Sequence, residues 1–439
     1  MQQNNRTLQI LMNGFLVGTL EKKAKGDVSF SYDQKWINAP LSRPISLSLP
    51  LQEQPLLGDP VYHFFDNLLP DNPQIRAQIQ SRFKIKTNHP FDLLACIGRD
   101  CVGAIQIEEN PLLFVKGIKC ESIDEKKIAH ILRGYQSPLG YSEENLDIFR
   151  ISIAGAQEKT AFLYHNQGWN IPLGQTPTTH IFKLPIGFIP HQQIDLKESC
   201  ENEWLCLKIA AAFGLPTAKG EILSFEDIKI LSVERFDRQL SADKTWFMRL
   251  PQEDMCQALG LSSNMKYQSD GGPGIHAIMQ LLLGSENPDF DRDFFYRTQV
   301  LFWLLAAIDG HAKNYSVFIK PQGNFCLTPL YDILSAYPLM ATGQLHPQKI
   351  KMAMALKGKN QHYHWDRIQY RHFIETAKAA HYPSEKAKNI LNTMLEQVEA
   401  VIEQISSEIP RTFPQHICNP IFEGMRAMKK RLIQSQCSD

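Results

Sequence analysis

The sequence predicts an α+β protein with a strand-rich first half and a mainly helical second half. Successive strand patterns follow one another over residues 149–236, and one strong helical pattern at 201–213 interrupts them. Beyond Arg238 the periodic apolar stretches are typical of helices, and they lie at 275–283, 294–308, 373–380 and 387–405. We therefore expect two lobes that meet near residues 236–238, where a ligand cleft is common.

The first hundred residues predict an added α/β subdomain. Asn13-Gly14 stands between two β-prone apolar runs, which is typical of a hairpin with a type I′ turn. Further strands are expected at 45–49 and 98–107, and helices at 61–69 and 74–83. The resulting division is 1–110 for the N-terminal subdomain, 111–237 for the first lobe and 238–439 for the helical lobe.

Composition limits the class of protein. The 439 residues include 46 Lys and Arg against 46 Asp and Glu, so the chain has no basic excess for bulk phosphate attraction. No secretory signal or membrane-length apolar run is visible, which predicts a cytoplasmic protein without a membrane partner. The nine scattered cysteines form no Cys-x-x-Cys and are expected to be reduced.

The most informative segment follows the most apolar helical pattern. Asp309 and Asn314 are five residues apart, and Asp332 follows a strand expected at 325–330. Phosphoryl transfer needs a carboxylate for the acceptor hydroxyl and hard oxygen ligands for Mg²⁺, and kinase catalytic loops have the same Asp-to-Asn spacing. Alone, the match is weak, because a helix terminus followed by a turn would look the same.

Upstream segments could complete a nucleotide site. Residues 152–160 lie between two strands where a phosphate-covering loop would be, although a simple hairpin turn with one Gly is the commoner interpretation. Lys183 lies on an otherwise apolar strand and could contact phosphates, or it could be a solvent-facing edge lysine. Glu203, on the following helix, could pair with Lys183, or it could be a solvated first-turn Glu.

The segment 233–237 lies at the expected lobe boundary. Backbone groups of Glu234 and Phe236 could read an adenine edge, and Asp237 could reach a ribose hydroxyl, although a plain strand end has a similar sequence. Each element is ambiguous alone. Along the chain, the segments come as a loop, a strand with a lysine, a helix with a glutamate, a hinge, the Asp-x₄-Asn spacing and a second Asp. This order favours a bilobal protein-kinase-like ATP site.

These segments resemble the HipA family of bacterial serine/threonine-kinase toxins, most closely the long, enterobacterial-type members. The matching motifs include Asp309-Gly310-His311-Ala312-Lys313-Asn314 and Tyr331-Asp332-Ile333. Other matching segments are 149–160, 178–185, 233–238 and 250–257, with 46–51, 64–71 and 98–100 similar to the family's N-terminal region. The likeness covers nearly the whole chain.

The resemblance implies a type II toxin that is a Mg-ATP-dependent serine/threonine protein kinase. Its implied substrate is glutamyl-tRNA synthetase, whose phosphorylation would stall translation and cause growth arrest and persistence. A HipB-like helix-turn-helix antitoxin would bind the chain, and the complex would repress its operon on operator DNA. The chain would then contact DNA through this partner and would associate with the nucleoid in that complex. Such an indirect contact agrees with the zero net charge of the chain.

The resemblance also assigns roles to residues. Asp309 would be the catalytic base, Asn314 and Asp332 would hold Mg²⁺, and Ser152 would be the autophosphorylation site whose phosphate switches the enzyme off. The implied nucleotide-binding residues are Ala154, Gly155, Ala156, Gln157, Glu158, Lys159, Lys183, Glu234, Phe236, Asp237, His311, Lys313 and Asn314.

Two other functions stay open. A small-molecule kinase of the aminoglycoside or choline type shares an Asp-x₄-Asn loop, and a non-catalytic co-repressor subunit would act only through an antitoxin. The segment Ser269–Gly274 could bind an anion at the start of a helix, but we interpret it as a flexible loop near the substrate groove.

Overall fold

The computed structural model describes residues 5–111, 114–136, 151–152, 157, 159–190 and 192–436. The chain forms two compact units. The first comprises residues 1–184, 223–264 and 316–325, and the second comprises residues 185–222, 265–315 and 326–439. Each unit is therefore assembled from separate stretches of sequence, and each is described by itself.

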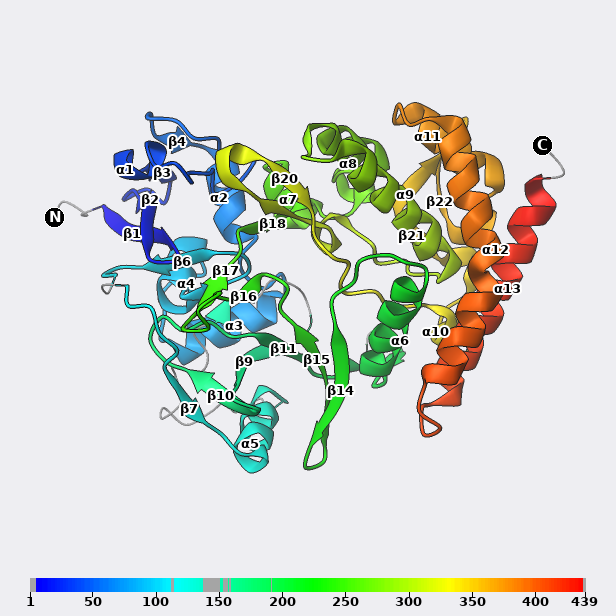
Figure 1. The fold of residues 1–439 in the computed structure, drawn as a ribbon, viewed down its shortest axis with the longest axis horizontal. Coiled ribbons are helices and arrows are strands. Elements are labelled where there is room, and N and C mark those ends of the chain that lie inside the picture. Colours follow the sequence, from blue (N-terminus) through cyan, green and yellow to red (C-terminus); the bar gives the residue numbers. More distant parts are fainter. Residues whose placement is uncertain are drawn as a thin grey trace. The chain divides into compact units, whose positions relative to one another are not determined.

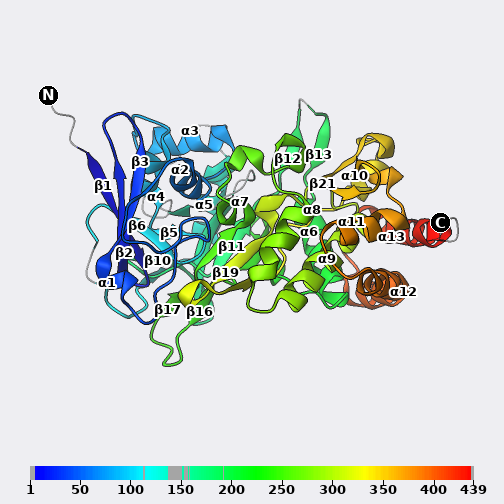
Figure 2. The same ribbon diagram turned by 90° about the horizontal axis from the view of Figure 1, so that it is seen from above.

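The N-terminal part of the first unit is a five-stranded sheet in the order β4-β3-β2-β1-β6 (Figures 1 and 2). Its strands are β1 (Arg6–Met12), β2 (Phe15–Lys22), β3 (Val28–Tyr32), β4 (Leu56–Leu57) and β6 (Ile105–Glu108). Its helices are α1 (Gln34–Ile37), α2 (Asp59–Asp66), α3 (Pro73–Arg82) and α4 (Pro90–Ile97). Packing of α2 against β3 and of α4 against β6 buries a core that includes Phe30, Phe64 and Leu94.

A second sheet has the order β14-β15-β11-β9-β10-β7 and belongs to the first unit except for residues 220–222 of β14. Its strands are β7 (Cys120–Ser122), β9 (Lys159–His165), β10 (Gly168–Pro172), β11 (His180–Lys183), β14 (Gly220–Phe225) and β15 (Ile228–Glu234). Helix α5 (Glu125–Gln136) packs its apolar stripe on this sheet, where Ile128 and Leu132 share a core with Phe162 and Phe182.

Short elements complete the first unit. They are β5 (Asp100–Cys101) paired in parallel with β8 (Ile151–Ser152), β16 (Arg238–Leu240) with β17 (Phe247–Arg249), and β18 (Gln252–Asp254) with β19 (Ser316–Ile319). Helix α7 (Met255–Ala258) begins with a capping box between Asp254 and Gln257.

The second unit is mainly helical. Its helices are α6 (Ser199–Ala212), α8 (Ile275–Leu281), α9 (Pro288–Leu304), α10 (Tyr337–Ala341), α11 (Tyr370–Ala379), α12 (Ser384–Glu408) and α13 (Gln415–Gln436). It also has two hairpins, β12 (Gly187–Ile189) with β13 (Ile194–Leu196), and β21 (Lys351–Lys357) with β22 (Gln361–His364). The long helices α12 and α13, orange and red in Figures 1 and 2, lie side by side and both pack on α9, which makes α9 the centre of this unit.

The α+β fold is confirmed, and so is the hairpin at Asn13-Gly14, where both residues adopt the positive φ angles that a type I′ turn needs. The prediction of a strand at 45–49 is wrong. The amide of Leu49 donates to the carbonyl of Ser46 at 3.0 Å, and the hydroxyls of Ser46 and Ser48 donate to the carbonyl of Gln257. Serine side chains that bind backbone groups favour a turn over a strand.

The bounds of several elements also differ from expectation. The helix expected at 294–308 is α9 and ends at Leu304, because Ala306 adopts a left-handed φ of 49°. The strand expected at 98–107 is split into β5 and β6, and the strand expected at 325–330 is β20 (Phe325–Leu327). Periodicity marks such elements better than it marks their ends.

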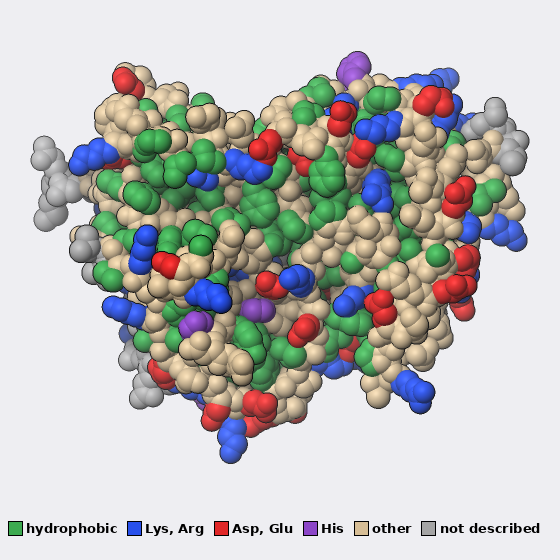
Figure 3. Space-filling model, viewed as in Figure 1, with side chains coloured by type: hydrophobic (Ala, Val, Ile, Leu, Met, Phe, Trp, Pro, Cys, Tyr) green, Lys and Arg blue, Asp and Glu red, His purple; other side chains and the backbone are tan. Residues whose placement is uncertain are grey.

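The described helices include none that is long and apolar enough to cross a membrane. On the face drawn in Figure 3, basic and acidic side chains are interspersed, and they do not gather into one basic area. The eight cysteines within the described ranges are all free thiols.

Candidate active site

Asp309 lies at an exposed turn just after the buried helix α9. The turn is tight at Gly310, where a Cβ atom would lie 2.3 Å from Cδ2 of the Phe302 ring. Phe302 is itself buried, so the ring cannot easily move. A glycine at this position therefore allows α9 to present Asp309 at a fixed place.

The structure brings Asp309 and Asn314 together. The side-chain amide of Asn314 donates from Nδ2 to the backbone carbonyl of Asp309 at 2.8 Å, and the amide of His311 donates to the same carbonyl at 2.7 Å. A 3₁₀ turn over Ala312–Asn314 fills the interval between them. The spacing of five residues thus closes into a compact hydrogen-bonded loop.

Asp332 is held by helix α6 of the same unit. Its backbone has a left-handed φ of 60°, and its amide donates to Oε1 of Glu203 at 3.2 Å. Next to Glu203, the side chain of Asn202 exchanges two hydrogen bonds with the backbone of Ser335. Glu203 thus fixes the segment that carries Asp332, a contact that the sequence did not suggest. Its predicted pairing with Lys183 stays a prediction.

The residues expected to hold Mg²⁺ suit that ion. With its Nδ2 donating to Asp309, the Asn314 side chain keeps Oδ1 as an acceptor, and Asp332 adds a carboxylate. Within the described ranges no group of three or more His, Cys, Asp and Glu is placed to hold a metal alone. Mg²⁺ sites commonly use one or two protein ligands, with substrate phosphates and water completing the shell.

His311 and Lys313 are buried on the same loop. The Tyr331 hydroxyl donates to the carbonyl of Lys313 at 2.9 Å, which ties this loop to the residue before Asp332. The loop and the Asp332 segment are therefore linked to each other directly. They are also linked through the residue that caps α9, because the Ser335 hydroxyl donates to the carbonyl of Leu305 at 2.6 Å.

In the first unit, two of the lysines expected to bind the nucleotide, Lys159 and Lys183, lie opposite each other on adjacent strands. Lys159 of β9 and Lys183 of β11 face each other in antiparallel register, so their side chains leave the same face of the sheet. The side-chain amide of Gln157 donates to the carbonyl of Leu184, beside Lys183. Two lysine side chains that leave the same face of a sheet could contact the phosphates of a nucleotide.

The end of β15 is also fixed within the first unit. The amide of Arg235 donates to the carbonyl of Thr179 at 2.8 Å, and Glu234 is exposed beside it. The half-buried ring of Phe236 meets Phe318 edge to face, with centroids 5.8 Å apart. Phe318, on β19, is an aromatic neighbour of this segment that sequence patterns did not identify.

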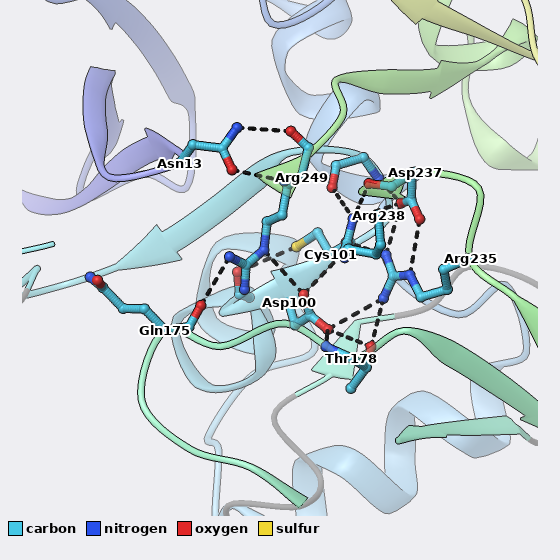
Figure 4. A network of polar contacts seen from close by, with 11 residues as sticks. Asn13, Asp100, Cys101, Gln175, Thr178, Arg235, Asp237, Arg238 and Arg249 are labelled. Atoms are coloured by element: carbon cyan, nitrogen blue, oxygen red, sulfur yellow. Dashed lines mark hydrogen bonds and ion pairs between the residues drawn. The ribbon is translucent and has the colours of Figure 1, made fainter. Parts of the chain in front are cut away.

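A buried ion-pair network anchors the residues that follow β15 (Figure 4). Asp100 of β5 contacts Arg235 Nη1 at 3.3 Å, Arg238 Nη2 at 2.9 Å and Arg249 Nε at 3.2 Å. Asp237 contacts Arg235 Nη2 and Arg238 Nη1, both at 2.9 Å. Three guanidinium groups thus surround two carboxylates, and all five side chains are buried.

The buried ion-pair network accounts for the orientation of the Asp237 side chain. Its Oδ2 also accepts the backbone amide of Gly103 at 2.7 Å, and its Oδ1 accepts Arg235 Nε at 3.0 Å. Both carboxylate oxygens therefore have protein partners. The predicted ribose contact of Asp237 is not tested by this arrangement and stays a prediction.

The charges in the network stabilise one another. Burial would raise the pKa of the Asp100 carboxyl, but Arg238, Arg235 and Arg249 outweigh it and lower that pKa. The pKa of Asp237 is lowered in the same way, against the effect of burial, by Arg235 and Arg238. Burial lowers the pKa of Arg238 to about 10, so this arginine is charged at neutral pH.

Several predicted residues lie outside the described ranges. They are Ala154, Gly155, Ala156 and Glu158 of the expected phosphate loop. Ser152 is described only through its backbone, which pairs with Cys101 where β8 meets β5.

The α+β fold, the lysine-bearing sheet, and the Asp-x₄-Asn loop tied to a second Asp together define a protein-kinase-like chain. Comparison with family models identifies the particular family. The HipA-like C-terminal domain matches residues 151–402, and the HipA N-terminal domain matches residues 8–108. The chain belongs to the HipA family of toxin kinases.

Individual relatives agree with this placement. A Sinorhizobium fredii protein with a kinase name, Y4mE, is 33% identical over 345 residues, which cover 76% of this chain and 78% of that protein. The serine/threonine-protein kinase toxin HipA of Shewanella oneidensis is 27% identical over 342 residues, covering 75% of each chain. The structure of Shewanella oneidensis HipA with HipB and operator DNA matches with a TM-score of 0.81 at 21% identity, covering 97% of both chains.

Proposed function

We propose that this chain is a Mg-ATP-dependent serine/threonine protein kinase and the toxin of a type II toxin-antitoxin system. The observation that carries the proposal is the exposed Asp309 carboxylate on a loop closed by Asn314, in the unit where α6 holds Asp332. Family membership supports the same chemistry.

In the proposed reaction, Asp309 orients the acceptor hydroxyl and takes its proton. The acceptor oxygen forms a bond to the γ-phosphorus while the bond from that phosphorus to the bridging oxygen of ADP breaks. Asn314 and Asp332 would hold Mg²⁺, which when bound neutralises phosphate charge. Lys159 and Lys183 would contact phosphates, as would His311, Lys313 and the segment 154–158.

The proposed protein substrate is glutamyl-tRNA synthetase, and its phosphorylation would stop translation and lead to persistence. Autophosphorylation at Ser152 would switch the kinase off, because a dianionic phosphate there repels nucleotide phosphates. A HipB-like antitoxin is the proposed partner, since the related Shewanella oneidensis HipA was solved with HipB and operator DNA. The proposed location is the cytoplasm, with nucleoid association in the antitoxin complex.

The test is phosphate transfer from γ-labelled ATP with Mg²⁺ to purified glutamyl-tRNA synthetase, together with growth after induction. We expect Asp309→Gln to abolish both transfer and growth arrest. A fully toxic Asp309→Gln variant would contradict the kinase-toxin function. Ser152→Ala should lose self-labelling while still labelling the synthetase.

The same assay separates the two other functions. Transfer to aminoglycosides or choline, with none to protein, would indicate a small-molecule kinase. A protein that transfers no phosphate but strengthens operator binding by an antitoxin would indicate a co-repressor subunit.

A further inference from the structure

Tyr267 makes a direct contact with the proposed catalytic base. Its hydroxyl donates to Oδ1 of Asp309 at 2.5 Å. We propose that Tyr267 is a positioning residue that holds the Asp309 carboxylate in the orientation needed by the acceptor hydroxyl. This inference rests on the proposed function, because it assigns Asp309 the role of base.

The backbone around Tyr267 is attached to the catalytic loop. The carbonyl of Lys266 accepts the amide of Ala312 at 3.1 Å, which links the residue before Tyr267 to the turn between Asp309 and Asn314. The Tyr267 ring meets the His311 ring edge to face, with centroids 5.0 Å apart and an interplanar angle of 86°. Tyr267 is therefore held on both its backbone side and its ring side.

The glycine-rich segment after Tyr267 closes this loop. The amide of Gly272 donates to the carbonyl of Tyr267 at 2.9 Å. A Cβ at position 272 would lie 1.9 Å from the carbonyl oxygen of Met265 and 2.7 Å from that of Tyr267, so only glycine fits. This turn gives Ser269–Gly274 a structural role, which its sequence did not reveal.

A further hydrogen bond fixes the same loop from outside. The side chain of Gln268 accepts the amide of Ala355, on β21, at 2.8 Å. Gln268 directly follows Tyr267, so the position of Tyr267 is set by β21 as well as by the catalytic loop. The loop is thus prearranged before any acceptor binds.

The chemistry of the contact follows from the exposure of Asp309. An exposed carboxylate with no fixed partner samples several rotamers, and aligning it costs entropy at each reaction. A charge-assisted O–H···O⁻ bond to one oxygen selects one rotamer and leaves Oδ2 to receive the acceptor hydroxyl. Phosphoryl transfer depends mainly on such positioning.

The test is Tyr267→Phe, which removes the hydroxyl and keeps the ring beside His311. We expect kcat for transfer to protein to fall about tenfold, while the KM for ATP is unchanged. The matched control is Tyr363→Phe. The Tyr363 hydroxyl donates to the side chain of Gln361, two residues away on β22, so this substitution also removes one tyrosine hydroxyl and its hydrogen bond. This control should keep wild-type kcat. A kcat for Tyr267→Phe that equals or exceeds the wild-type value would overturn the proposal.

A second measurement does not depend on activity. In a double-mutant cycle of Tyr267→Phe and Asp309→Ala, the shifts in urea midpoint should be non-additive if the two side chains interact. Additive shifts would show that the contact is not formed and would overturn the proposal. If the cycle shows coupling but Asp309→Ala keeps full transfer, then the assignment of Asp309 as base fails, and with it the positioning role.

Discussion

The carboxylate of Asp100 lies 2.9 Å from the guanidinium of Arg238, and both side chains are buried. Asp100 belongs to the part of the chain that matches the HipA N-terminal domain, and Arg238 belongs to the part that matches the C-terminal domain. The contact therefore ties the two family domains together inside one compact unit. Arg238 directly follows the segment 233–237, whose backbone groups are expected from the sequence to read an adenine edge.

Asp100→Asn should destabilise the protein strongly. The substitution removes the charge that faces Arg235, Arg238 and Arg249, and it leaves these cations buried with one carboxylate between them. Breaking one partner of a buried ion pair typically costs about 3–5 kcal/mol. Urea unfolding measures the loss.

The control for this prediction is Glu385→Gln. Glu385 pairs with Lys388 on the exposed side of α12, and a surface pair of this kind contributes about 0–1 kcal/mol. A change for Asp100→Asn as small as that for Glu385→Gln would show that the buried network does not stabilise the fold.

Glu253 predicts a pH dependence of stability. This side chain is fully buried, and its Oε1 accepts the amide of Leu47 at 2.8 Å. Burial raises the pKa of Glu253 to about 8, against the opposing effect of the Leu47 amide. An acid with a raised pKa in the folded state binds its proton more tightly there, so stability falls as pH rises from about 4.5 to about 8.

Glu253→Gln should remove this part of the pH dependence, because Gln keeps the acceptor for Leu47 and does not ionise. The unfolding free energy of the variant minus that of the wild type should grow with pH by up to about 1.4 kcal/mol per unit in this range. Chemical denaturation at several pH values measures it. A difference that is constant from pH 5 to pH 8 would mean that Glu253 is not protonated in the folded state.

Gly310→Ala should damage the catalytic loop. Its Cβ would collide with the buried Phe302 ring, and overpacking of this kind costs about 1–3 kcal/mol. We expect lower phosphate transfer together with a lower melting temperature. Gly168→Ala is the matched control, since a Cβ at position 168 has no neighbour within 4 Å. Equal effects of the two substitutions would show that the turn at Asp309 tolerates a side chain.

Asn314→Ala should raise the Mg²⁺ concentration needed for half-maximal phosphate transfer. The substitution removes the oxygen proposed to bind Mg²⁺ and also the hydrogen bond to the carbonyl of Asp309. A Mg²⁺ titration of initial rates measures the change. His346→Ala, at an exposed position of the same unit, should keep the wild-type Mg²⁺ dependence. An unchanged Mg²⁺ dependence of Asn314→Ala would remove Asn314 from the proposed metal site.

Local features of this protein could be predicted from the sequence. The Asn13-Gly14 hairpin depends on two adjacent residues that tolerate positive φ angles, and α9 depends on a short-range apolar pattern. The loop from Asp309 to Asn314 closes over five residues, and this spacing, taken together with the upstream segments, indicated that the two residues could act together.

Contacts between distant segments were decided only by the tertiary structure. Tyr267 is 42 residues from Asp309, Glu203 is 129 from Asp332, and Asp100 is 138 from Arg238. A polar side chain in a sequence has many possible partners, and burial among other elements selects one of them. Residue types and local spacing therefore predicted which residues could carry the chemistry, while packing decided which side chains hold them in place.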